Sequence, residues 1–183
     1  MSRLSDLDVD QMSPAQRRVH DEIAAGPRGG VAGPLTVWLH SPDLADRAQK
    51  LGEFARFNSS LPPRLSELAI LVTARHWRAQ YEWFAHEPFA LKAGLGPEVI
   101  TAIRERRRPT FSARDEEAVY DLATSLHENH AVGEDTYRTA VERLGETMVV
   151  DLVGLLGYYV LVAMTLNTFE VAVPDGATRP LRD

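Results

Sequence analysis

Apolar residues recur along most of the chain at spacings of three and four, which is the pattern of amphipathic helices. A clear example is the run Leu44, Ala48, Leu51 and Phe54. Convincing alternation of apolar and polar residues at every second position, which would indicate half-buried strands, is lacking. The pattern therefore predicts an all-α protein.

Proline and glycine mark the ends of the predicted helices. Ser13-Pro14 and Ser41-Pro42 each offer an N-cap followed by proline at the first helical position, and the stretch from Ser112 to Asp115 resembles a capping box. Gly33-Pro34 is expected to keep the next residues irregular. The predicted helices, seven or eight in number, run over about 14–25, 42–57, 63–76, 79–93, 97–108, 112–129, 134–144 and 148–166.

The length of 183 residues suits one domain with a full core. We divide the chain into an N-terminal helix and loop (1–30), a main helical domain (31–173) and a C-terminal tail (174–183). The tail is rich in turn residues and has few apolar anchors, so it is expected to dock loosely or fray.

Residues 148–166 form a strongly apolar stretch with a single charge, Asp151. Its length is marginal for crossing a bilayer, and a carboxylate in mid-membrane is costly. We therefore interpret it as a buried core helix. The N-terminus is polar and acidic and lacks an apolar signal core, so a cytoplasmic location is expected.

The net charge of −6 argues against nucleic-acid binding, which needs clustered cations. The one basic run, Arg104 with Arg106 to Arg108, precedes Pro109 and is expected to be a solvated helix end, where cations favour the helix dipole. His127 and His130, beside Glu128 at another helix end, are likewise expected to be solvated.

The candidate chemistry gathers around His86. Glu82 lies four residues before it, so the two side chains share a helix face, and Tyr81 can reach over the same opening. Glu67 lies on the preceding helix among apolar neighbours, where a buried carboxylate needs a partner. If the two helices pair, His86 is that partner, and the result is a carboxylate-oriented imidazole suited to proton transfer. The alternative is a purely structural pair, with Tyr81 and its aromatic neighbours in the core.

The segment from Leu61 to Gly96 resembles the core signature of the carboxymuconolactone decarboxylase and alkylhydroperoxidase D-like (AhpD-like) family. Glu67 matches the family's upstream acid and His86 its histidine. The two positions that hold redox cysteines in the peroxidase branch are Ala79 and Glu82 here. The resemblance extends more loosely to residues 38–42 and to the stretch that ends at Asn167.

This resemblance implies a helical bundle that assembles into dimers, trimers or hexamers, with the site near the subunit contacts. It also implies an enzyme without a cofactor that decarboxylates a small carboxylated lactone or organic acid. In that enzyme His86 would be the general acid and base, Glu67 its orienting group, and Glu82 or Tyr81 would handle a second proton or the lactone oxygen. Arg75, Arg78 and Arg56 are candidates for binding the substrate carboxylate, and the remaining candidate substrate contacts are Trp83 and His40.

The chain has no cysteine, which excludes thiol-dependent peroxidase chemistry, disulfides and Cys-based metal sites. A further alternative is a helical oligomer that binds a small ligand without catalysis, or a metal at Glu67, Glu82 and His86. Neither alternative is excluded by the residues alone, although one histidine and two glutamates are a thin set of metal ligands.

Overall fold

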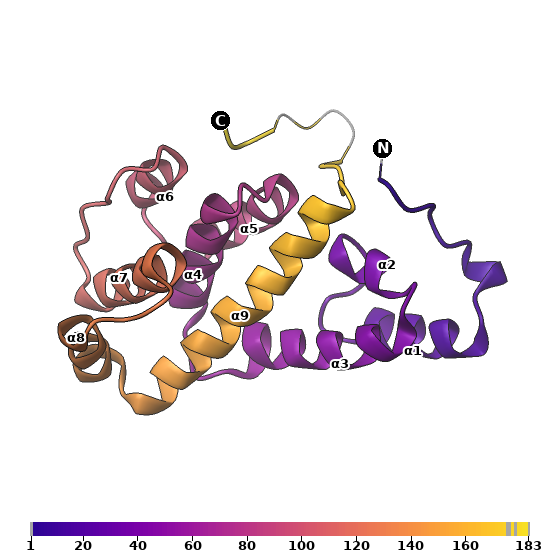
Figure 1. Cartoon of the computed structure of the whole chain (residues 1–183), viewed down its shortest axis with the longest axis horizontal. Helices are drawn as coiled ribbons and strands as arrows, with labels where there is room; N and C mark the ends of the chain where they lie inside the picture. The colour runs from indigo at the N-terminus through magenta and orange to yellow at the C-terminus, as the bar shows by residue number, and fades with distance from the viewer. Residues whose placement is uncertain (1, 175–176, 178, 183) are drawn as a thin grey trace.

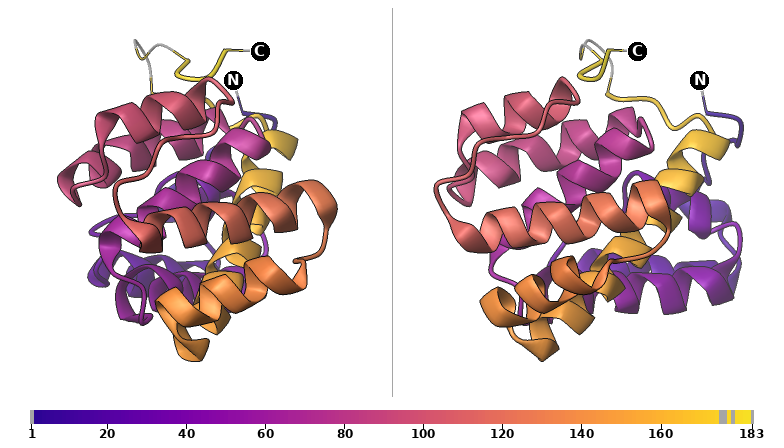
Figure 2. Two further views of the ribbon diagram at one scale, coloured as in Figure 1. Left: turned by 90° about the vertical axis from the view of Figure 1, so that its left-hand side faces the viewer. Right: turned by 60° about the vertical axis from the view of Figure 1, so that its left-hand side comes forward.

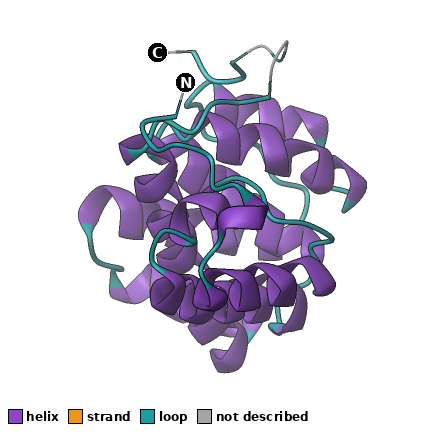
Figure 3. Cartoon of the chain, turned by 90° about the vertical axis from the view of Figure 1, so that its right-hand side faces the viewer, coloured by secondary structure: helices purple, strands orange, loops and turns teal. Residues whose placement is uncertain are grey.

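The computed structural model describes residues 2–174, 177 and 179–182, and within these ranges the chain is helical without a strand (Figures 1 and 3). The α-helices are α1 (Pro14–Ala25), α2 (Pro34–Trp38), α3 (Pro42–Glu53), α4 (Pro63–His76), α5 (Gln80–Lys92), α6 (Pro97–Arg104), α7 (Arg114–Asn129), α8 (Glu134–Leu144) and α9 (Glu146–Thr168). Two short helical turns complete the set, η1 (Val9–Gln11) and η2 (Phe54–Asn58). The all-α prediction is confirmed.

Most predicted helix starts are confirmed, and Ser13 forms the full capping box with Gln16 that opens α1. Two local predictions are wrong. The stretch after Gly33 is not irregular but forms α2, because Gly33 adopts a positive φ of 61° and Pro34 then begins a helical turn. The capping box at Ser112 does not form, because α7 begins one residue later, with Ala113 at its N-cap and no side-chain cap.

Helix α4 is the centre of the bundle. Every residue from Leu65 to Arg75 is buried, since α5, α7 and α9 pack against it on different sides. In Figure 1, α9 crosses the molecule beside α4, and Figure 2 shows α6 and α7 on the other side. A helix that is buried all round holds its polar residues in fixed surroundings, and this is the helix that carries Glu67.

Helix α9 is long and apolar enough to cross a membrane, but 56% of its most apolar window is buried within the fold. The one charged residue within its apolar stretch, Asp151, bonds another part of the fold, since its Oδ2 accepts hydrogen bonds from Ser60 N at 2.8 Å and from Ser60 Oγ at 2.7 Å. The structure therefore places it as the core helix that the sequence predicted. The face of α9 turned away from α4 stays exposed, with Val150, Val153 and Met164 on it.

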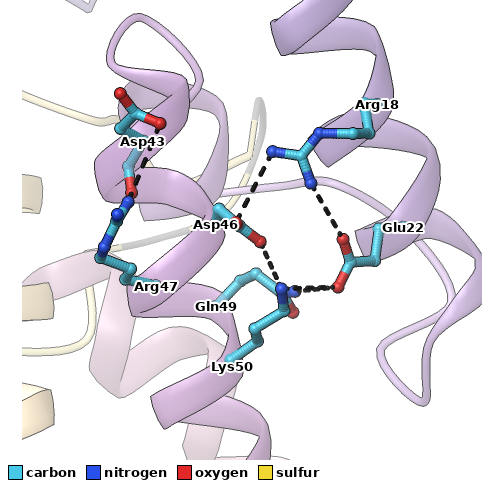
Figure 4. A network of polar contacts seen from close by, with 7 residues as sticks. All are labelled: Arg18, Glu22, Asp43, Asp46, Arg47, Gln49 and Lys50. Atoms are coloured by element: carbon cyan, nitrogen blue, oxygen red, sulfur yellow. Dashed lines mark hydrogen bonds and ion pairs between the residues drawn. The ribbon is translucent and has the colours of Figure 1, made fainter.

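The N-terminal helix α1 lies against α3 through a network of charged side chains (Figure 4). Arg18 pairs with Glu22 and Asp46, and Lys50 lies 2.6 Å from Asp46 and 3.3 Å from Glu22. Such exposed pairs contribute little each. Burial of Val19 and Ile23 in the common core does more to attach α1, so this helix packs onto the main domain.

The basic run after α6 is exposed at Arg106 to Arg108, but its arginines are also engaged. Arg104 bonds Glu87, Arg107 bonds Glu105, and Arg108 bonds Asp121 and Glu117. The expectation of a merely solvated helix end was incomplete, because these arginines fasten α6 and its loop to α5 and α7.

The C-terminal tail is anchored at Leu181 and at Arg182, whose carbonyl accepts a hydrogen bond from Arg75 at 3.2 Å. Leu181 is buried, and its backbone N–H and carbonyl both bond the side-chain amide of Gln80, at 3.0 and 2.9 Å. The prediction of a loose or frayed tail is wrong at this position, because one apolar side chain and an amide clamp are enough to hold it. Positions 175, 176, 178 and 183 lie outside the described residues.

Candidate active site

Helices α4 and α5 bring Glu67 and His86 into direct contact. The two helices are joined by residues 77–79 only and pack along each other. His86 Nδ1 lies 2.7 Å from Glu67 Oε2, and both side chains are buried. Because a carboxylate only accepts hydrogen bonds, Nδ1 donates, and Nε2 is the ring nitrogen left for another partner. The pairing inferred from the sequence is therefore present.

Glu82 lies one helical turn before His86 and is buried at 2% exposure. Among the described residues neither of its carboxyl oxygens has a hydrogen-bond partner. Burial raises the pKa of Glu82 well above its ordinary value. A raised pKa favours the protonated form of the side chain, a neutral carboxylic acid that can donate a proton or a hydrogen bond.

The side chains of Glu82 and His86 face one cavity of about 270 Å³. Its walls come from α5, α9, α2, η2 and the loop before α2. The lining residues are Arg28, Gly30, Ala32, Pro34, Leu35, Arg56, Tyr81, Glu82, Ala85, His86, Phe89, Tyr158, Tyr159, Val162 and Leu166. The volume is close to the lower limit for small-molecule sites, so the cavity suits a compact ligand.

Aromatic rings form much of the wall. Tyr159 meets the His86 imidazole edge to face, with centroids 5.1 Å apart, and Tyr158 meets Tyr159 in the same way at 5.3 Å. Burial raises the pKa of Tyr81, of Tyr158 and, most strongly, of Tyr159, so all three phenols keep their protons at neutral pH. The cavity therefore offers neutral proton donors and flat apolar faces together.

Two arginines provide the positive charge. Arg56 lies in the π-helical turn η2, and its guanidinium stacks 4.7 Å from the centroid of Phe89 and 5.1 Å from that of Phe57. Arg28 comes from the loop after α1 and donates to the carbonyl of Gln49 at 3.2 Å. Both are half-buried cavity residues. A small anion in the cavity would therefore be met by two guanidinium groups.

The structure brings together four predicted catalytic residues, with Tyr81, Glu82 and His86 in the cavity wall and Glu67 behind His86. It does not bring the four predicted substrate contacts there. Arg75 and Arg78 line other cavities, because the chain turns at Arg78 with a positive φ of 52°. Trp83 points into the core and donates to Glu87, and His40 is exposed after α2. Of the three arginines considered as anchors, Arg56 alone lines this cavity.

Three polar cavity residues, Arg28, Tyr158 and Tyr159, were missed by sequence reasoning. Arg28 lies in a Gly/Pro-rich segment that was interpreted only as the end of a helix. The feature of the sequence that could have pointed to a functional role is its charge, which stands between glycines. The pair Tyr158 and Tyr159 was assigned only to the apolar helix. Two adjacent tyrosines in such a helix need polar surroundings for their hydroxyl groups, and this could have indicated a cavity.

The alternative of a metal site is not supported by the geometry. Within the described part of the chain, no group of three or more histidine, aspartate or glutamate side chains could hold a metal ion. Glu67 instead bonds His86, and burial raises the pKa of Glu82, which disfavours the carboxylate form that binds metals.

No protein-family model matches the chain, and no curated protein matches it significantly. Solved structures do match. The apo crystal structure of the debrominase Bmp8 is 12% identical, with a TM-score of 0.70 over 96% of this chain and 92% of that one. A protein of unknown function from Agrobacterium tumefaciens, ATU0492, provisionally described as the antioxidant defence protein AhpD, is 14% identical, with a TM-score of 0.67 over 78% of this chain and 99% of that one. At these identities the likeness establishes the fold.

Proposed function

We propose that this chain, which has the AhpD-like helical fold, is a cofactor-free enzyme that decarboxylates a small carboxylated lactone or a related organic acid. The observation that carries the proposal is the buried carboxyl group of Glu82, which has no partner among the described residues, in one cavity with His86 of the Glu67–His86 pair. A paired imidazole and a neutral carboxylic acid are the two kinds of group that general acid–base catalysis needs at neutral pH.

The bond changes of such a reaction fit these groups. When a carboxylate leaves an unsaturated lactone as carbon dioxide, the electron pair of the broken C–C bond moves through the ring double bond to the lactone carbonyl oxygen. A hydrogen-bond donor stabilises the resulting enolate oxygen, and Glu82 or Tyr81 would provide it. A ring carbon must then take a proton. His86 would deliver it from Nε2 after that nitrogen has taken up a proton from water, while Nδ1–H stays bonded to Glu67.

The rest of the cavity accounts for substrate binding. The ring would lie against Tyr158, Tyr159 and Phe89, whose faces are apolar. A second carboxylate, which 4-carboxymuconolactone carries beside the one that leaves, would pair with Arg56 or Arg28. The leaving carboxylate would sit away from these cations, because their attraction to it would oppose its loss. We propose a cytoplasmic location as part of this function.

The test is carbon dioxide release from 4-carboxymuconolactone by metal-free protein. We expect turnover by the wild-type chain that survives chelation, and a loss of about 100-fold or more in kcat for His86→Ala, as for other general acid–base groups. Arg56→Leu should instead raise KM, because it removes an anchor for the substrate.

Circular dichroism of each variant separates loss of catalysis from loss of fold. If the wild type binds the lactone without releasing carbon dioxide, the cavity belongs to a ligand-binding protein. Carbon dioxide release that is unchanged in His86→Ala would contradict the assigned acid–base role.

A further inference from the structure

A second cavity, of about 300 Å³, lies at the end of α4, where the ends of α6 and α7 also meet. It shares no lining residue, among those described, with the cavity at His86. Its wall contains Val72, Arg75, His76, Ile103, Arg106, Arg107, Tyr120, Thr124, His127 and Glu128. None of these residues has a part in the proposed decarboxylation.

Two histidines lie side by side in this wall. The rings of His76 and His127 are stacked, with centroids 4.8 Å apart and planes 19° apart. The sequence-based expectation that His127 is solvated is wrong, because α7 packs its last turns against α4 and leaves the side chain buried. His130, three residues on, is exposed as expected.

The hydrogen bonds of His127 fix its tautomer. Thr73 Oγ1 donates its only proton to the carbonyl of Ala69 at 2.9 Å, so it must accept from His127 Nε2, which lies 3.0 Å away. Burial lowers the pKa of His127 to about 4, so the ring is neutral near pH 7. Its Nδ1 is then a hydrogen-bond acceptor in the cavity wall.

Cations outnumber anions in the same wall. The wall contains three guanidinium groups, those of Arg75, Arg106 and Arg107, and one carboxylate, that of Glu128. Arg107 also bonds Glu105, and Arg75 donates to the carbonyl of Arg182 at 3.2 Å. Arginine in a partly enclosed site is suited to bind oxyanions through paired N–H donors.

Arg106 also occupies an unusual backbone position. Its φ is +58°, in the left-handed region, at the end of α6 where glycine is the common residue. Here a large cation takes that place and lines the cavity. Replacement by glycine would therefore relieve the backbone while removing the charge, which separates binding from folding.

We propose that this second cavity binds a phosphate group, as inorganic phosphate or as a small phosphate monoester. The arginines supply donors to the phosphate oxygens, and the acceptor nitrogen of His127 suits the P–OH of a hydrogen phosphate, which a carboxylate does not have. Val72, Ile103 and Tyr120 provide apolar contact for an organic substituent.

The test is calorimetric titration of the full chain with inorganic phosphate, phenyl phosphate and benzoate. Saturable binding of phosphate is expected, with benzoate clearly weaker. Tighter binding of phenyl phosphate would identify the ligand as a monoester, and equal or weaker binding would identify it as the free ion. Arg106→Gly should weaken phosphate binding by about tenfold or more without lowering Tm.

Arg78→Gly is the matched control, since Arg78 also has a positive φ, of 52°, but lines another cavity. Phosphate binding should be unchanged in this variant. In the wild type, phosphate should also shift the imidazole NMR signals of His127, because the P–OH group would donate a hydrogen bond to its Nδ1. The proposal is overturned if neither inorganic phosphate nor phenyl phosphate binds, or if benzoate binds equally well. It is also overturned if Arg106→Gly and Arg78→Gly lose the same affinity for phosphate, or if the His127 signals do not respond.

Discussion

The carboxyl group of Glu82 is buried without a hydrogen-bond partner among the described residues, which raises its pKa in the folded protein and makes stability depend on pH. In the unfolded chain the group has an ordinary pKa near 4.5. Between that value and the raised pKa of the folded state, unfolding releases a proton. The free energy of unfolding therefore falls as pH rises through this interval.

We expect Glu82→Gln to remove that dependence. Glutamine keeps the shape and cannot ionise, so the variant should be more stable than the wild type above about pH 5. The difference should grow by about 1.4 kcal/mol per pH unit until the folded-state pKa is reached. Urea unfolding between pH 5 and 8 measures it.

Glu142→Gln, at an exposed position, is the control and should show no such trend. A wild type and a Glu82→Gln variant whose stabilities run parallel across this range would show that Glu82 is ionised in the folded protein.

At the scale of residues, the sequence predicted contacts that follow from spacing on regular helices. Glu82 and His86 are one turn apart, and Glu67 needed a partner that only the next helix could supply. The contacts of the arginines could not be predicted in this way, because a long side chain can reach in many directions. Arg78 itself adopts a left-handed backbone conformation and Arg56 lies within a π-helical turn, and neither conformation is evident from the sequence.

The connection between η2 and α4 is joined to α9 through one carboxylate. Asp151, in the second turn of α9, accepts two hydrogen bonds from Ser60. We expect Asp151→Ala to lower the free energy of unfolding by about 1–2 kcal/mol, because hydrogen bonds to a charged group are lost at a half-buried site.

Asp151→Asn keeps an acceptor oxygen and should retain most of the stability, and chemical denaturation compares the two variants. Equal losses would show that the charge rather than the hydrogen bonds stabilises this contact.

At the scale of elements, proline and glycine made most helix ends predictable, since they act through local sterics. The boundaries of α1 and α8 were predicted in full. Helix α2 was missed because a helix of five residues is too short to show a periodic pattern. Its formation depends on the backbone conformation of Gly33 and on burial of Trp38. The indole of Trp38 donates a hydrogen bond to Thr165 on α9 at 2.9 Å. Such a contact between distant segments has no local signal.

At the scale of the whole molecule, the outer face of α9 is an exposed apolar stripe. Val150, Val153 and Met164 are 69, 49 and 45% exposed, and the exposed glycines 154 and 157 between them would permit close approach. We expect a second copy of the chain to cover this stripe, since exposed apolar patches mark association sites.

Light scattering should then give a mass above 20.4 kDa for the wild type. Val153→Asp should return it to that value, because a charge would be buried at the contact. Thr139→Asp, on the exposed side of α8, should leave the assembly intact. A wild type of 20.4 kDa at high concentration would exclude this interface.

Helix α9 also connects this stripe to the candidate site. With 23 residues it is a rod about 35 Å long, and the same turns that expose Val153 and Met164 hold Tyr158, Tyr159 and Val162 in the cavity wall. A shift of α9 at a subunit contact would therefore move the surface against which a substrate ring lies. Dilution that separates the subunits would then change turnover per subunit, so that specific activity becomes a function of protein concentration.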